Sequence, residues 1–148
     1  MARIKNAKTK YFVADVIDGT GEPVWLRLSK WITNVSDDGS DTTDDQGDYD
    51  GDGNMKTVVL GYSEAYTFEG THDREDEAQN LIVAKRRTPD NRSIMFKIEI
   101  PDTETAIGKA TVSDIKGSAG GGDATEYPVF SCRIAYDETP EITPATLP

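Results

Sequence analysis

Three aspartates near the middle of the chain have the spacing of metal ligands. Asp48, Asp50 and Asp52 occupy every second position, and Gly53 follows them. This order matches the first half of an EF-hand loop, in which alternating carboxylates bind Ca²⁺. The twelfth position of that loop needs a bidentate glutamate, but Val59 stands there, and no helix pattern precedes Asp48. The spacing therefore leaves two interpretations, a weak Ca²⁺ site at these aspartates or a solvated acidic loop, and no other cofactor is expected.

The residues that could serve nucleophilic catalysis do not form a recognisable set. His72 is the only histidine, which excludes sites built from two histidines. Cys132 alternates with Phe130 and Ile134, so its thiol is expected on the apolar face of a strand, where cysteine behaves as a small hydrophobic group. No glycine-rich segment has the complete pattern of a phosphate-binding loop. We therefore expect no enzymatic activity.

Negative charge is concentrated in one segment. Residues 37–54 contain eight aspartates and four glycines but no lysine or arginine. The whole chain has 27 acidic and 16 basic residues, whereas outside this window the counts are 19 and 16, so the net charge there is −3 instead of −11. We expect a long, mobile acidic loop at about 36–56, and loops of this length are usually functional or disordered. This charge does not suit a protein that grips nucleic-acid phosphates.

Length and apolar patterning predict a single domain, 1–148, that can bury a core without metal or disulfide. The longest apolar runs are far shorter than the ~20 residues that span a bilayer, so no membrane insertion is expected. Residues 1–6 lack the apolar stretch of a secretory signal, and the single cysteine excludes an intrachain disulfide. A cytosolic folding environment fits these features.

Most of the chain alternates apolar and polar residues, which is typical of β-strands with one buried face. The segments with this pattern are 11–17, 23–35, 58–70, 94–100, 110–113 and 130–136. We therefore expect a mainly β fold, either an antiparallel β-sandwich or a barrel.

One segment departs from this alternation and predicts a single flanking helix at about 73–87. Thr71 or Asp73 could cap it, acidic residues occupy its first turn, and basic residues occupy its last. Leu81 and Ile82 contribute to a narrow apolar stripe that would lie on the sheet.

The two ends of the chain are expected to be extended arms. Residues 1–10 are basic, and the prolines in 137–148 argue against a regular strand or helix there. Opposite charges on separate segments can steer identical subunits into register. We therefore expect the acidic loop to contact the N-terminal bases or the helix-end bases of a neighbouring subunit, and to gain order there. The residues of this predicted interface are Arg3, Lys5, Lys8, Asp44, Asp45, Asp48, Lys85, Arg86 and Arg87.

The order of these parts resembles the major tail tube proteins of siphovirus-type bacteriophages, those with long non-contractile tails, that infect Gram-positive bacteria. The most specific pieces are residues 69–79, which read EGTHDREDEAQ, and residues 127–136, which begin YPVF and end AY. The resemblance covers nearly the whole chain.

This resemblance implies a structural virion protein. Six copies would form a ring whose inner sheets join into a barrel, and stacked rings would enclose the tape measure protein and later conduct DNA. It further implies contacts with tail terminator and baseplate proteins, a place in the virion tail, and assembly in the host cytoplasm. Joining sheets across subunits would also remove exposed strand edges.

A binding module is the alternative interpretation. A β-sandwich of this size could bind Ca²⁺ or carbohydrate on a phage or cell surface, and exposed aromatic residues would favour that function. Trp25, Trp31 and Tyr49 are the candidates.

Overall fold

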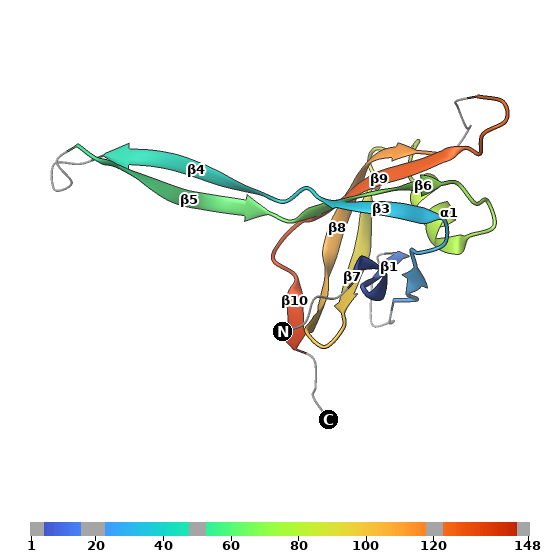
Figure 1. The fold of residues 1–148 in the computed structure, drawn as a ribbon, viewed down its shortest axis with the longest axis horizontal. Helices are drawn as coiled ribbons and strands as arrows, with labels where there is room; N and C mark the ends of the chain where they lie inside the picture. Colours follow the sequence, from blue (N-terminus) through green and yellow to red (C-terminus); the bar gives the residue numbers. More distant parts are fainter. Residues whose placement is uncertain (1–4, 16–22, 48–52, 118–122, 145–148) are drawn as a thin grey trace.

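The computed structural model describes residues 5–15, 23–47, 53–117 and 123–144. Its strands are β1 (Lys10–Asp15), β2 (Leu26–Arg27), β3 (Ile32–Asp37), β4 (Ser40–Gly47), β5 (Met55–Ser63), β6 (Ala65–Thr71), β7 (Ser93–Ile100), β8 (Glu104–Lys116), β9 (Val129–Tyr136) and β10 (Glu141–Pro144). The main sheet has the order β2-β1-β7-β8-β9-β6-β3, with β10 on β8, and β4 and β5 form a separate pair (Figure 1). All pairings are antiparallel.

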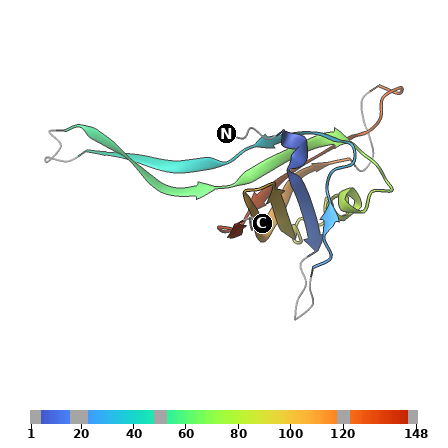
Figure 2. The same ribbon diagram turned by 60° about the horizontal axis from the view of Figure 1, so that its bottom comes forward.

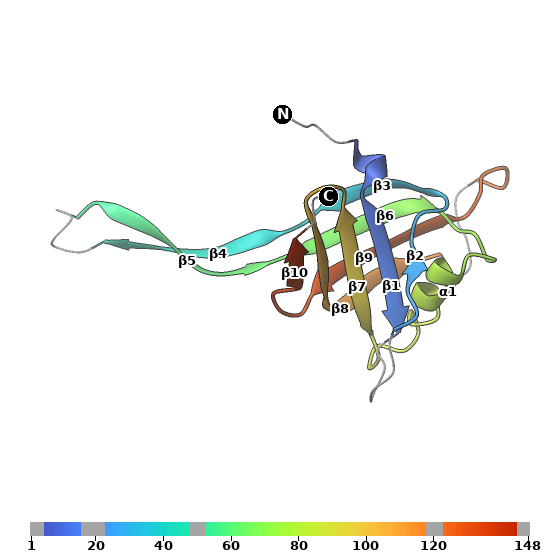
Figure 3. The ribbon, with the colours of Figure 1, turned by 90° about the horizontal axis from the view of Figure 1, so that it is seen from below.

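The main sheet curls into a half-barrel. One layer contains β2, β1 and β7, and the strands β9, β6 and β3 cross behind it (Figure 3). The long strand β8 joins the two layers, because its residues 104–111 pair with β7 whereas its residues 110–116 pair with β9. The expectation of a mainly β, antiparallel fold with one helix is confirmed.

The hydrophobic core lies inside this curl. Phe68, Phe96 and Phe130, from β6, β7 and β9, are among its largest fully buried side chains. The Phe96 ring meets the Phe68 ring edge-on at a centroid distance of 5.9 Å and tilts against the Tyr136 ring at 5.4 Å. Such aromatic pairs add roughly 0.5–1.5 kcal/mol each beyond the burial of their surface. The alternation predicted for β7 and β9 is confirmed by their burial patterns.

The acidic segment is largely a β-hairpin and not the loop expected at 36–56. We call residues 40–47 and 55–63, which are β4 and β5, the arm; it projects far from the main sheet (Figures 1 and 2). Aspartate is a poor strand former. The aspartate-rich strand β4 is nevertheless extended, because it pairs along its length with β5, which contains valine and other strand-forming residues. The strand predicted at 58–70 is accordingly divided at Glu64 into β5 and β6.

The helix α1 spans Glu77–Val83 and is therefore shorter than the predicted helix at 73–87. Its N-cap is Asp76, whereas Thr71 ends β6. The buried side chain of Gln79 accepts a hydrogen bond from the backbone N–H of Asp73 at 2.7 Å and donates one to the Thr71 carbonyl at 3.1 Å. These bonds hold the preceding segment outside the helix. The apolar face of α1 packs against β1, β2 and β8.

The terminal segments also contain regular structure. One 3₁₀ turn, η1 (Asn6–Lys8), precedes β1. Although we expected the prolines of 137–148 to exclude a strand, β10 pairs with β8 as an edge strand, where an unpaired backbone nitrogen is tolerated. Pro144 is its last residue. In the part of the chain that the structure describes, no helix has the length and apolarity to cross a membrane.

Candidate assembly surfaces

The arm has two different faces. Directly opposite residues of an antiparallel pair lie on the same face, so Val59 shares a face with its partner Thr43, and Tyr62 shares it with Asp41. The register shifts after Thr42, which leaves Leu60 as an extra residue on β5. One face of the arm therefore combines large apolar side chains from β5 with short polar and acidic side chains from β4.

These apolar side chains are exposed to water. Met55, Val59, Leu60 and Tyr62 are 63%, 58%, 62% and 56% exposed, and no residue of the arm is fully buried. A two-stranded ribbon alone is marginally stable in water, and contiguous exposed apolar surface marks an interaction site. The arm thus has the composition of a segment that becomes buried against another molecule.

Side-chain hydrogen bonds close the base of the arm and join it to the rest of the chain. The hydroxyls of Ser40 and Ser63 lie 3.1 Å apart where the arm begins, and the Tyr62 hydroxyl lies 2.6 Å from that of Thr139. Thr67 donates to the Asp38 carboxylate. These contacts fix the direction in which the arm leaves the sheet.

A groove lies between the N-terminal elements and β3. It has a volume of about 590 Å³ and is lined by residues of η1, β1, the segment after β2, β3 and Tyr66. Within the described residues, β3 pairs with β6 along one edge and has no strand against the other. Open edges of this kind are templates for pairing with a further strand.

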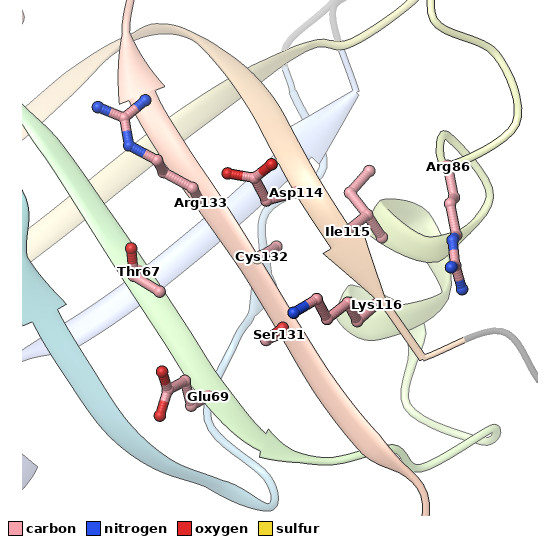
Figure 4. A pocket seen from close by; sticks show the side chains of 9 residues that line it. All are labelled: Thr67, Glu69, Arg86, Asp114, Ile115, Lys116, Ser131, Cys132 and Arg133. Carbon is pink, nitrogen blue, oxygen red and sulfur yellow. The ribbon is translucent and has the colours of Figure 1, made fainter. Parts of the chain in front are cut away.

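The outer face of β6, β9 and β8 forms a second, shallower hollow of about 360 Å³ (Figure 4). Glu69 lies opposite Ser131 in the ladder and Thr67 lies opposite Arg133. The hollow also contains Asp114, Lys116 and Arg86. Because acidic and basic groups are interspersed, this face is polar without a large charge of either sign.

Four of the predicted interface residues are exposed on the N-terminal segment or on the arm. Lys5 and Lys8 are exposed next to the groove, and Asp44 and Asp45 are exposed on β4. Arg3, Asp48, Asp50 and Asp52 lie outside the described residues. The structure therefore does not test the predicted Ca²⁺ site.

The three basic residues at the helix end, Lys85, Arg86 and Arg87, differ in exposure, although they were expected to act together. Lys85 is 6% exposed, and its Nζ lies 3.2 Å from Oδ1 of Asp15 at the end of β1. Its ammonium group is therefore paired within the chain, whereas the prediction had it facing a neighbouring subunit. Arg86 and Arg87 are exposed, and the Arg86 carbonyl accepts a hydrogen bond from Arg92 at 2.7 Å.

We predict that Lys85→Glu destabilises the fold, because it places a carboxylate in a buried position beside Asp15. Removing one partner of a buried ion pair costs about 3–5 kcal/mol, and exposure of Asp15 should keep the loss near the lower limit. Arg87→Glu, two residues away and exposed, should change the free energy of unfolding by less than about 0.5 kcal/mol. Urea denaturation of both variants measures the difference, and equal losses would contradict the structural role of Lys85.

Cys132 and His72 are both enclosed by neighbouring side chains. Cys132 is 1% exposed, and burial raises the pKa of its thiol to about 12. The His72 ring lies near the Phe130 ring at a centroid distance of 6.3 Å, and neither ring nitrogen has a hydrogen-bond partner among the described residues. Burial, and secondarily the Arg74 charge, lower the pKa of His72, against an opposing effect of Asp73.

We predict a pH-dependent stability that comes from His72. Since the pKa of His72 is lower in the folded protein, the unfolded chain binds a proton first as the pH falls below about 6.5. The free energy of unfolding should therefore decrease between pH 7 and pH 5. His72→Phe preserves the ring contact with Phe130 and removes the titration, so its stability curve should be flatter over this interval. Parallel curves for the two proteins would contradict the assignment.

A strained turn before β3 was not predicted. Trp31 has φ 64°, a left-handed conformation that is costly for a residue other than glycine. Its carbonyl accepts a hydrogen bond from the Thr71 N–H at 3.0 Å, and its indole N–H donates to the Asp73 carboxylate at 3.1 Å. Gly70 lies against this turn, because a Cβ there would be 2.0 Å from the Trp31 carbonyl oxygen. Gly70, the last residue of the strand predicted at 58–70, was the available signal of such a close approach.

Comparison with known proteins gives a consistent result at the level of structure. No family model matches the sequence, and no curated protein matches it. The SPP1 tail tube has a TM-score of 0.68 at 10% sequence identity, covering 97% of this chain and 80% of that one. The tail of the empty gene transfer agent particle, refined with C6 symmetry, has a TM-score of 0.66 at 14% identity, covering 96% and 99%. The chain has the fold of tail tube proteins.

The tail tube fold extends to contractile systems. The sheath-tube complex of an extracellular contractile injection system contains a similar chain, with a TM-score of 0.60 at 15% identity, covering 97% of this chain and 93% of that one. The coverage includes almost all of this chain in each of these comparisons.

Proposed function

We propose that the protein is a structural subunit that assembles with copies of itself into stacked hexameric rings, which form a phage tail tube. The exposed apolar and acidic arm is the observation that carries this proposal. Its apolar side chains are exposed in the single subunit and would be buried by contact with a second copy. The tail tube fold supplies the geometry, and the C6 symmetry of one neighbour supports a six-membered ring.

The proposed tube encloses the tape measure protein during assembly and conducts DNA at ejection. The mixed-charge outer face of β6, β9 and β8 suits a channel wall, because a strongly basic wall would hold the phosphates of passing DNA. The tube would end at tail terminator and baseplate proteins, within a virion of the siphovirus type that infects a Gram-positive host. Assembly would take place in the host cytoplasm, and no catalysis is part of the proposal.

Electron microscopy of the purified protein tests the proposal. Rings and tubes of regular diameter should appear in negative stain and increase with protein concentration. Analytical ultracentrifugation should show a transition from subunits to large polymers without a stable dimer. A protein that stays monomeric at millimolar concentration would contradict the proposed function.

A binding function remains as a second candidate because of one aromatic hollow. Trp31 and Tyr127 are 56% and 80% exposed and line a space of about 620 Å³ that also contains Asp73 and Arg74. Exposed rings beside charged hydrogen-bonding groups can bind sugars. Glycan-array binding that is lost in Trp31→Ala, by a protein that forms no tubes, would favour this candidate over the tube subunit.

A further inference from the structure

The groove beside β3 combines an apolar floor with an open strand edge. Tyr11, Ile32, Val35 and Tyr66 are partly buried hydrophobic side chains that pack on the core and also line the groove. Along this groove β3 has no strand against its outer edge among the described residues. The free subunit thus presents apolar side chains and unpaired backbone groups side by side, which an extended segment can satisfy together.

Basic side chains surround this groove. Lys5 and Lys8 flank the η1 residues that line it, Lys10 starts β1, and Arg27 lies on its wall. All four residues are exposed, and none has an ion pair within the described part of the chain. Asp37 is the one acidic residue among the lining residues. The rim is therefore positively charged.

The arm has the complementary properties. Asp41, Asp44 and Asp45 are exposed on β4, and none is ion-paired in the described residues. The large exposed apolar side chains Met55, Val59 and Tyr62 of β5 share a face of the arm with Asp41 and Asp45. Both strands of the arm have an outer edge, because β4 and β5 pair only with each other among the described strands. The arm projects away from β1 and β3 of its own chain (Figure 3), so an arm lying in this groove would come from another copy.

We propose that the arm of one subunit docks in the groove beside β3 of a second copy, with the aspartates of β4 against the basic rim. This inference rests on the proposed function and adds the receiving surface and the source of its specificity. It replaces the helix-end alternative, because Lys85 is buried and paired with Asp15.

Charge reversal tests the electrostatic part. Lys5→Glu with Lys8→Glu, and separately Asp41→Lys with Asp45→Lys on the apolar face of the arm, should each raise the protein concentration needed for tube formation at least about tenfold, since like charges then face each other across the contact. The variant that carries all four reversals should recover most of the loss. Arg87→Glu with Lys109→Glu, at two exposed positions outside the groove, is the matched control and should leave assembly unchanged. Equal losses in the single-sided variants and in the fourfold variant would overturn the charge pairing.

Cross-linking tests the location. Thr43→Cys on β4 and Asn34→Cys on β3 are exposed positions, and a short bis-maleimide should join them between subunits of assembled tubes. Native Cys132 should not react, because it is buried. The control pair, Thr43→Cys with Thr103→Cys on the turn after β7, should give no product. Tubes that cross-link through Thr103, or that give no product at Asn34, would overturn the docking site while the proposed function stands. A wild-type protein without tubes would overturn the proposed function itself.

Discussion

Replacement of residues 40–63 by Asn-Gly should abolish tube formation and leave the main sheet folded. The cut lies where the structure already closes a hairpin, because Ser40 is directly opposite Ser63 and the Asp38 N–H donates to the Ala65 carbonyl at 2.8 Å. Asn-Gly is the preferred two-residue connection between antiparallel strands. The arm contributes no residue to the hydrophobic core, so the free energy of unfolding should change by no more than about 1 kcal/mol. Sedimentation should detect monomers at every concentration that yields tubes from the wild type.

A milder variant separates the arm's surface from its length. Val59→Ser with Leu60→Ser keeps the hairpin and removes exposed apolar side chains, so polymerisation should weaken without a change in thermal stability. Val58→Thr, on the opposite face of the arm by its pairing with Asp44, is the matched control and should assemble normally. Normal tubes from the deletion variant would show that subunits associate through the main sheet alone.

The alternation of apolar residues was sufficient to predict the parts of the fold that have one buried face. β7 follows it from Ser93 to Glu99 and β9 follows it along its whole length, because one side of each strand covers the core and the other side is partly exposed. The helix was predicted from its charges and apolar stripe, but its length was overestimated, since Gln79 binds the backbone before Asp76. The alternation pattern therefore identified the strands and the helix that have one side on the hydrophobic core.

The arm could not be predicted in this way, since neither of its strands has a buried face in the free chain. β4 is extended because it pairs with β5, and the sequence pattern had predicted β5 and β6 as one long strand. The same reason explains the misjudged role of Lys85: a lysine after an apolar stripe can point to solvent or, as here, reach Asp15 from a buried position. The groove beside β3 exists because β3 lies at the end of the main sheet. The order of strands in a sheet depends on the topology of the whole fold, and the alternation within one segment does not reveal it.

Gly70→Ala should cause the largest loss of stability among alanine substitutions at the glycines that the structure describes. The added Cβ would lie 2.0 Å from the Trp31 carbonyl oxygen and 2.9 Å from the Ile32 Cα. Both are backbone atoms, so relief requires movement of the turn that carries Trp31. That movement would weaken the hydrogen bond from the Thr71 N–H, which joins the turn to β6. Overpacking of this kind costs about 3 kcal/mol, which lowers the melting temperature of a domain of this size by roughly 6–12 °C.

Gly61→Ala is the matched control, because a Cβ at Gly61 on β5 meets no atom within 4 Å. It should leave the melting temperature unchanged or slightly raised, since alanine restricts the unfolded chain more than glycine does. Gly70→Ala should also weaken assembly in proportion to the displacement of β3, because the Trp31 turn leads directly into that strand and its groove. A Gly70→Ala protein with wild-type stability would mean that the turn adapts freely, and the positive φ of Trp31 would then have no structural role in holding β3.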